Sequence, residues 1–293
     1  MSNIQFKEEC LSNLRSRYHR DGFVIIDDVF PSADLEEFQL TLSYLIRTYL
    51  KKASMEHRQD FFSKIPPGRE LDQGSVLLEE IDHAYIRCLY ACIRKMPEFV
   101  RLHNAQRITD TIRSLLQLDS ASPLYSGSQI CRIDIPQIKG YTFGWHQEVF
   151  YQIPKSEFTQ TWGPLVSSLT EGFGALEVLV GSHHEGVARQ IWNTKEGIPD
   201  QILVVPEVIE KYSTKIVEIQ LGQILFFSGK LVHKSGYHTK PDTRYTLVGS
   251  YHSVENEHFY PDQGVTPSEL TARSFYEEER AKWPQPRKTP ARH

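Results

Sequence analysis

The chain has 293 residues, a formal net charge of -4 and 24% charged residues, a composition that excludes wholesale disorder. A dedicated nucleic-acid binder would usually show a basic excess, which is absent. No run of about 18 apolar residues occurs, so the sequence predicts no membrane-spanning helix. The polar start, Met1 to Leu11, lacks the apolar stretch of a secretory signal. We therefore expect a cytoplasmic protein, with its oligomeric state open.

The first part of the chain, about residues 1–124, shows mostly helical periodicity. A short apolar run, Phe23 to Ile26, lies between acidic residues and predicts a strand. Pro31-Ser32 then opens a helix whose apolar residues recur at steps of three and four. The same spacing predicts two further helices, at about 77–95 and 108–118. We expect these helices to flank a core formed by the rest of the chain.

From Tyr125 onward, apolar runs separated by glycine, proline and polar clusters predict strands, as in a barrel or jelly roll. The predicted strands are Gln129–Ile135, Pro164–Leu169, Ala175–Val180, Lys215–Ile219, Gln223–Phe227 and Tyr245–Tyr251. We interpret residues 1–293 as one domain with its core over about 125–255. The C-terminal extension, 256–293, is basic and proline-rich after Glu279, and we expect that tail to be extended.

Three residues have the chemistry of a metal site. His146 and Glu148 are two apart, so on a strand their side chains would point to the same side. His233, which follows a strongly apolar strand, can supply a third ligand. Two histidines and one carboxylate with open positions suit non-haem iron(II). The pair His183-His184 is a rival, but neighbours on a strand face opposite sides, so a polar turn is the simpler interpretation.

Arg244, beyond His233, opens the apolar strand up to Tyr251. Its planar guanidinium could bind a carboxylate through two hydrogen bonds, as a dicarboxylate cosubstrate would need. The alternative is a surface salt bridge. Arg132, on the strand that leads to His146, is the next candidate for such an anchor.

Residues from about Arg17 to Tyr251 resemble the phytanoyl-CoA dioxygenase family of Fe(II)- and 2-oxoglutarate-dependent oxygenases. The resemblance lies in Arg20-Asp21-Gly22-Phe23-Val24-Ile25, in Gly174-Ala175-Leu176-Glu177-Val178-Leu179-Val180-Gly181-Ser182-His183, and in Gly222-Gln223-Ile224-Leu225-Phe226-Phe227 followed by His233. It implies a mainly β fold with α: a double-stranded β-helix (jelly-roll) core with N-terminal helices. It also implies Fe(II), 2-oxoglutarate and O2 as cofactors.

The resemblance assigns roles residue by residue. It implies His146, Glu148 and His233 as iron ligands, and Arg244 as the 2-oxoglutarate anchor. The further cosubstrate candidates are Ser235, Trp162, Gln129 and Arg132. Glu148 departs from the aspartate that is usual in the family. It keeps the charge and adds one methylene of reach, about 1.5 Å, so we interpret it as an active variant.

The expected reaction is hydroxylation of an unactivated C–H bond in a small or sugar-type substrate. The HxE variant and the chain length also resemble one member group, the bacterial Kdo 3-hydroxylases, which act on the Kdo sugar of lipopolysaccharide. Clustered basic residues could then receive an anionic glycolipid at an anionic membrane surface. Two alternatives remain: a non-catalytic metal-binding sensor or scaffold, and a cupin-like metal-dependent isomerase.

Overall fold

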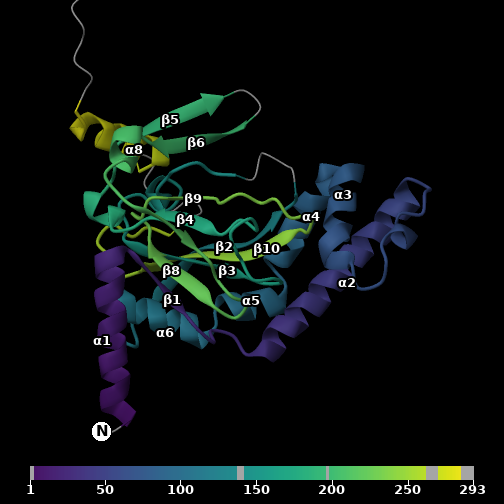
Figure 1. Ribbon diagram of the computed structural model, residues 1–293, viewed down its shortest axis with the longest axis horizontal. Coiled ribbons are helices and arrows are strands. Elements are labelled where there is room, and N and C mark those ends of the chain that lie inside the picture. The colour runs from purple at the N-terminus through teal and green to yellow at the C-terminus, as the bar shows by residue number, and fades with distance from the viewer. Residues whose placement is uncertain (1–2, 137–141, 196–197, 262–269, 285–293) are drawn as a thin grey trace, which may run out of the picture.

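Two antiparallel sheets face each other at the centre of the computed structural model, which describes residues 3–136, 142–195, 198–261 and 270–284 (Figure 1). The larger sheet has the order β1-β8-β3-β10-β2 and the smaller sheet β7-β4-β9. The strands of the larger sheet are β1 (Phe23–Ile26), β2 (Leu124–Asp134), β3 (Phe158–Pro164), β8 (Ile224–Ser228) and β10 (Arg244–Ser253). Those of the smaller sheet are β4 (Leu176–Leu179), β7 (Thr214–Val217) and β9 (His233–Lys234). This is the expected jelly-roll core.

The alternation of side chains along each strand divides the core into two layers. On β8, Ile224 and Phe226 pack against helices, whereas Leu225 and Phe227 point between the sheets. The inner layer continues through Trp162 of β3 and reaches the smaller sheet at residues such as Val178. A strand buried on both faces explains why this segment reads as a continuous apolar run.

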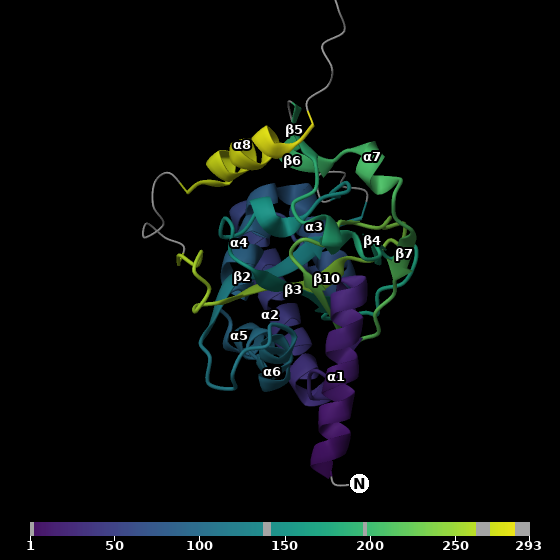
Figure 2. The ribbon, with the colours of Figure 1, turned by 90° about the vertical axis from the view of Figure 1, so that its left-hand side faces the viewer.

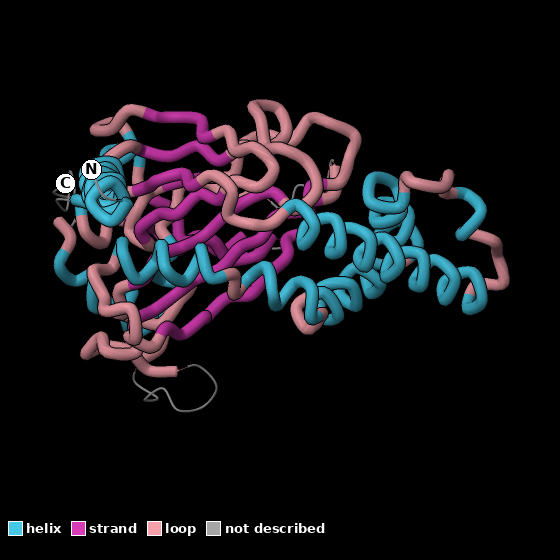
Figure 3. Tube along the Cα trace, turned by 90° about the horizontal axis from the view of Figure 1, so that it is seen from below, coloured by secondary structure: helices cyan, strands magenta, loops and turns pink. Residues whose placement is uncertain are grey.

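Helices cover the outer face of the larger sheet and extend beyond it (Figure 3). Their apolar stripes and the strand residues that face them form the largest cluster of buried side chains. The helices are α1 (Asn3–Asp21), α2 (Ser32–Glu56), α3 (Ser75–Ile81), α4 (His83–Ile93), α5 (Pro97–His103) and α6 (Gln106–Leu115). None of the helices described is long and apolar enough to cross a membrane.

Three elements close the remaining side of the core. The hairpin β5 (Gln190–Lys195) and β6 (Ile198–Val204) lies beside α8 (Ala272–Lys282) at one end of the molecule (Figure 2). Tyr276 of α8 donates its hydroxyl hydrogen to the Gln190 carbonyl, and its ring lies 5.3 Å from that of Trp192. α7 (Pro206–Ile209) then leads the chain back to the smaller sheet.

Most predicted elements are confirmed, three differ, and some observed elements were not predicted. The strand predicted at 164–169 is wrong: β3 ends at Pro164 and includes the polar residues before it. The helix predicted at 77–95 is two helices, since Asp82 is extended and caps α4 through the Ala84 amide. Neither α5 nor the β5–β6 hairpin was predicted. Arg280 and Lys282 belong to α8 and not to an extended tail, while residues 285–293 lie outside the described part.

Candidate metal centre

His146, Glu148 and His233 come together as the sequence predicts. A carboxylate oxygen of Glu148 lies 3.5 Å from Nε2 of His146 and 3.4 Å from Nε2 of His233. The three ligand atoms all lie within 4.8 Å of one another, so this group could hold a metal ion. An octahedral metal with bonds of roughly 2.1 Å would separate neighbouring ligand atoms by about 3 Å. The two distances from the carboxylate oxygen to the imidazole nitrogens, 3.4 and 3.5 Å, are close to that value.

The backbone brings the two histidines together. His146 and His233 form an antiparallel bridge, with hydrogen bonds of 2.9 and 3.0 Å between their amides and carbonyls. Contrary to the expectation of a strand, Glu148 begins a 3₁₀ turn that ends at Phe150. Gln147 between them is extended, so the alternation of side chains still holds across the motif.

Both histidines are oriented for metal binding. Nδ1 of His146 lies 2.8 Å from the Gly144 carbonyl, and Nδ1 of His233 lies 3.0 Å from the Leu231 carbonyl. A carbonyl can only accept, so Nδ1 carries the proton and Nε2 keeps the lone pair that a metal needs. Burial, and then the neighbouring His146, lower the pKa of His233. Its ring is therefore neutral at neutral pH.

The third donor is the carboxylate of Glu148, which has an oxygen within 3.5 Å of Nε2 of both histidines. Two neutral imidazoles and one carboxylate are the donor set of non-haem iron sites. The residues present therefore fit the metal that the sequence implied.

Gln147, in the middle of the motif, was not predicted to matter. It is fully buried, and its amide group donates to the carbonyls of Gly186 and Lys230. Its carbonyl accepts from the Ala188 amide and from the side chain of Gln190. These four bonds fix the residue between the two ligands to distant loops.

Replacing Gln147 with alanine should therefore destabilise the protein. The substitution leaves several buried donors and acceptors unpaired, and we expect a loss of about 2–4 kcal/mol in the free energy of unfolding. Denaturant titration measures this loss. The control is Gln220→Ala, since Gln220 is exposed, which should change stability by less than about 0.5 kcal/mol. Equal stability of the two variants would contradict the bracing role of Gln147.

His146 and Glu148 border a cavity of about 370 Å³ between the larger sheet and the segment that follows residue 142. Its described lining comes from the inner face of the sheet, from that segment and from Tyr90 of α4. The lining residues are Ser128, Ile130, Arg132, Gln160 and Val248, then Phe143, His146, Glu148, Tyr151 and Gln152, and Tyr90. A cavity of this size suits a small molecule or one sugar unit.

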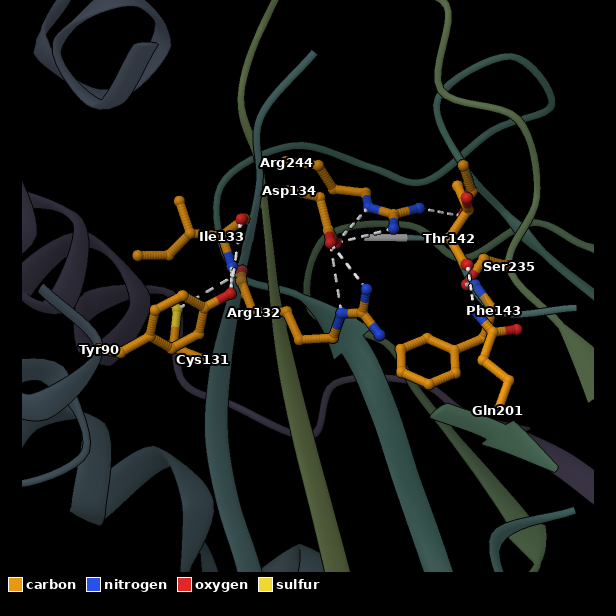
Figure 4. A network of polar contacts seen from close by, with 11 residues as sticks. Tyr90, Cys131, Arg132, Ile133, Asp134, Thr142, Phe143, Gln201, Ser235 and Arg244 are labelled. Carbon is orange, nitrogen blue, oxygen red and sulfur yellow. Dashed lines mark hydrogen bonds and ion pairs between the residues drawn. The ribbon is translucent and has the colours of Figure 1, made fainter. Parts of the chain in front are cut away.

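Arg244 is not among the described residues that line this cavity, and its side chain is only 4% exposed. Its Nε and Nη2 donate to Oδ2 of Asp134 at 3.0 and 2.7 Å (Figure 4). Its Nη1 donates to the Gly174 carbonyl. Its guanidinium carbon lies 5.9 Å from the ring centre of Trp162. Three of its five N–H donors are engaged within the described residues, and the other two suit a ligand carboxylate.

Asp134, which was not predicted, is shared between two arginines. Its Oδ1 accepts from Arg132 at 2.8 Å, while its Oδ2 accepts from Arg244. Burial alone would raise the pKa of Asp134, but the two guanidinium groups outweigh burial and lower it. Because Arg244 pairs with Asp134 across the strands β10 and β2, both arginines face the interior.

Gly174 sets the position of Arg244. Its φ is +72°, and a Cβ there would collide with Nη1 of Arg244. We expect Gly174→Ala to raise the requirement for 2-oxoglutarate and to lose about 1 kcal/mol of stability from the backbone alone. Gly172, with φ +80° and ordinary contacts, is the matched control. Gly172→Ala should lose similar stability and keep the cosubstrate requirement, and equal requirements in both variants would show that Gly174 does not position Arg244.

The other predicted site residues occupy different places in the structure. Trp162 faces the interior beside Arg244, and Arg132 lines the cavity. Ser235 accepts a hydrogen bond from the Phe143 amide, so its hydroxyl can still donate. Gln129 bonds to Ser126 and is not among the described residues that line the cavity. The rival pair is also separate, since Nε2 of His183 lies 2.9 Å from the His19 carbonyl.

The comparisons with known proteins agree with this fold. The family model for phytanoyl-CoA dioxygenase matches residues 18–246. Among curated proteins no sequence matches the chain. Among solved structures, the epimerase SnoN in complex with Fe3+, alpha ketoglutarate and nogalamycin RO has a TM-score of 0.56 and 15% sequence identity. That similarity covers 90% of this chain and 93% of SnoN.

Two further structures have the same fold. EvdO2 from Micromonospora carbonacea var. aurantiaca, complexed with 2-oxoglutarate, has a TM-score of 0.51 and 15% identity over 88% of this chain and 96% of its own. The carbocyclase SnoK from nogalamycin biosynthesis has a TM-score of 0.51 and 14% identity over 83% of this chain and 84% of its own. The match to the family model spans well over half of the sequence. The chain therefore belongs to the phytanoyl-CoA dioxygenase family of Fe(II)- and 2-oxoglutarate-dependent oxygenases.

Proposed function

We propose that the protein hydroxylates an unactivated C–H bond of a small or sugar-type molecule, with His146, Glu148 and His233 as the iron ligands. The observation that carries this proposal is the meeting of these three side chains at one point, where two of them, His146 and Glu148, line a cavity. When bound, iron, 2-oxoglutarate and O2 supply the oxidising chemistry. 2-Oxoglutarate loses CO2 to give succinate, and the two oxygen atoms of O2 enter succinate and the hydroxylated product. The roles of the protein are positioning and exclusion of water.

Arg244 would bind the far carboxylate of 2-oxoglutarate, with Trp162 beside it and Ser235 as a further contact. Asp134 orients Arg244 from one side and Gly174 from the other. A planar, pre-oriented guanidinium suits bidentate binding of a carboxylate. Gln129 and Arg132 were further candidates for cosubstrate contacts, and the burial of Arg244 beside Trp162 favours Arg244.

The test is succinate release from 2-oxoglutarate with added Fe(II) and ascorbate. Release that depends on Fe(II), and that rises with a substrate, would support the proposal. A cupin-like isomerase would convert its substrate without consuming 2-oxoglutarate. A metal-binding sensor or scaffold would release no succinate with any compound.

As the substrate we propose Kdo-lipid A, hydroxylated on its Kdo sugar. The support is Glu148 in place of the usual aspartate and a cavity that fits one sugar unit. The product should be heavier by one oxygen, in a reaction that needs Fe(II) and 2-oxoglutarate. Peripheral association with an anionic membrane surface belongs to the same proposal. No mass shift with Kdo-lipid A, alongside activity on another compound, would overturn this substrate and leave the oxygenase standing.

A further inference from the structure

Gln160 of β3 is a buried polar residue on the wall of the metal cavity. It is only 2% exposed, and it lines the same cavity as His146 and Glu148. Its carbonyl oxygen, Oε1, has no hydrogen-bond partner among the described residues. A buried acceptor without a partner costs free energy, so native proteins rarely leave one unless a ligand or a water completes it. The unpaired oxygen therefore indicates a ligand in this cavity.

The strand register places Gln160 close to the metal ligands. Gln160 pairs with Phe227 of β8, and directly opposed residues of an antiparallel pair have their Cβ atoms roughly 5 Å apart on the same face of the sheet. The ring of Phe227 lies 4.8 Å from the ring of His233. A molecule that contacts Oε1 of Gln160 would therefore lie near the metal.

The same sheet separates Gln160 from the predicted cosubstrate anchor, Arg244. Alternate residues of β10 share the inner face, and Val248 and Ser250 pair with Trp162 and Gln160. Ser250 is six residues beyond Arg244, roughly 20 Å along the strand. Trp162, which lies beside the guanidinium of Arg244, stands between the two places. Gln160 therefore borders the part of the cavity that a substrate would occupy, away from the far carboxylate of 2-oxoglutarate.

Two neighbouring polar residues on this wall, Ser128 and Gln152, are paired with each other. Oε1 of Gln152 accepts hydrogen bonds from the hydroxyl groups of Ser128 and Ser250, at 3.2 and 2.7 Å. Gln160, on the same wall, keeps an acceptor without a donor. An acceptor requires an O–H or N–H group, and donors and acceptors side by side suit a hydroxyl, which both donates and accepts.

We propose that Gln160 is a specificity-determining residue whose Oε1 accepts a hydrogen bond from a hydroxyl group of the substrate. The substrate class that this contact implies is a sugar or another polyol, held with that hydroxyl near the metal. The inference rests on the proposed function and adds the residue that recognises the substrate and the group that it recognises. A molecule without the hydroxyl would leave Oε1 buried and unpaired, and would bind less tightly.

The test uses the methyl glycosides of glucose, galactose, mannose and Kdo, and the monodeoxy analogues of each. Each compound is titrated calorimetrically, without oxygen, into the protein loaded with Fe(II) and 2-oxoglutarate. We expect at least one glycoside to bind about 10-fold or more tightly than one of its deoxy analogues, because that analogue leaves Oε1 unpaired. Gln160→Met, which is similar in size but has no amide, should reduce this difference to about twofold or less. Gln160→Glu, which keeps an acceptor oxygen, should retain part of it.

The controls separate this role from a structural one and from cosubstrate binding. Gln160→Met should bind 2-oxoglutarate with a dissociation constant within about twofold of the wild type. Thermal unfolding shows whether each variant is folded, and Gln160→Leu takes the place of Gln160→Met if the latter is not. Thr159→Val changes the next residue of β3, whose hydroxyl lies 3.1 Å from that of Tyr18 on the other face of the sheet. This variant should keep the full difference.

Three results would overturn the inference: no glycoside that binds better than a deoxy analogue, a difference that survives Gln160→Met, or weaker 2-oxoglutarate binding in that variant. Failure of the proposed function would instead appear in the wild type, as an absence of succinate release.

Discussion

Each of His146→Ala, Glu148→Ala and His233→Ala should lower succinate release by at least about 100-fold, since even the loss of a residue that only orients a ligand costs 10- to 100-fold. All three side chains converge on one point, so each substitution removes one ligand of the same metal. Glu148→Asp should keep partial activity, because the charge and the donor atom survive. Metal content measured after dialysis should fall with activity in the alanine variants.

The control for these variants is His183→Ala. His183 belongs to the rival pair, and its ring contacts the His19 carbonyl at a site apart from the ligands. This variant should retain its metal and its activity. Full activity in any of the three ligand variants, with a normal unfolding transition, would overturn the assignment of the metal centre.

The pairing of His146 with Glu148 could be predicted because it depends on local spacing, whereas His233 was inferred from its place after an apolar strand and from the family resemblance. An extended residue between His146 and Glu148 is enough to point both side chains to one side, and the structure supplies this through Gln147 although Glu148 begins a 3₁₀ turn. The structural role of Gln147 could not be predicted. Its four hydrogen bonds reach loops about forty and eighty residues further along the chain, and the residues next to it in the sequence do not indicate them.

Asp134 shows the same limit. Its carboxylate meets Arg244, 110 residues away, only because β10 pairs with β2 in one particular register. A shift by one residue would turn both side chains to the opposite face. The sequence-based prediction placed the strand β3 too far along the chain for a related reason. Thr159, Gln160 and Thr161 are polar yet buried between neighbouring strands, so apolar patterning does not reveal them.

Cosubstrate binding should depend on Arg244 and not on Arg132. Arg244→Lys keeps the charge but loses the planar fork that now reaches Asp134 and Gly174. We expect the KM for 2-oxoglutarate to rise about 10- to 100-fold, which corresponds to the loss of one charge-assisted hydrogen bond. At saturating 2-oxoglutarate, kcat should change much less, because the iron ligands are untouched.

The variant Arg132→Lys tests whether Arg244, and not Arg132, binds the cosubstrate. Both arginines bond to Asp134 and both face the interior of the same sheet, so a general disturbance of the cluster would affect either substitution alike. Binding at Arg244 predicts a raised KM for 2-oxoglutarate in Arg244→Lys and an unchanged KM in Arg132→Lys. The reverse result would move the cosubstrate to Arg132.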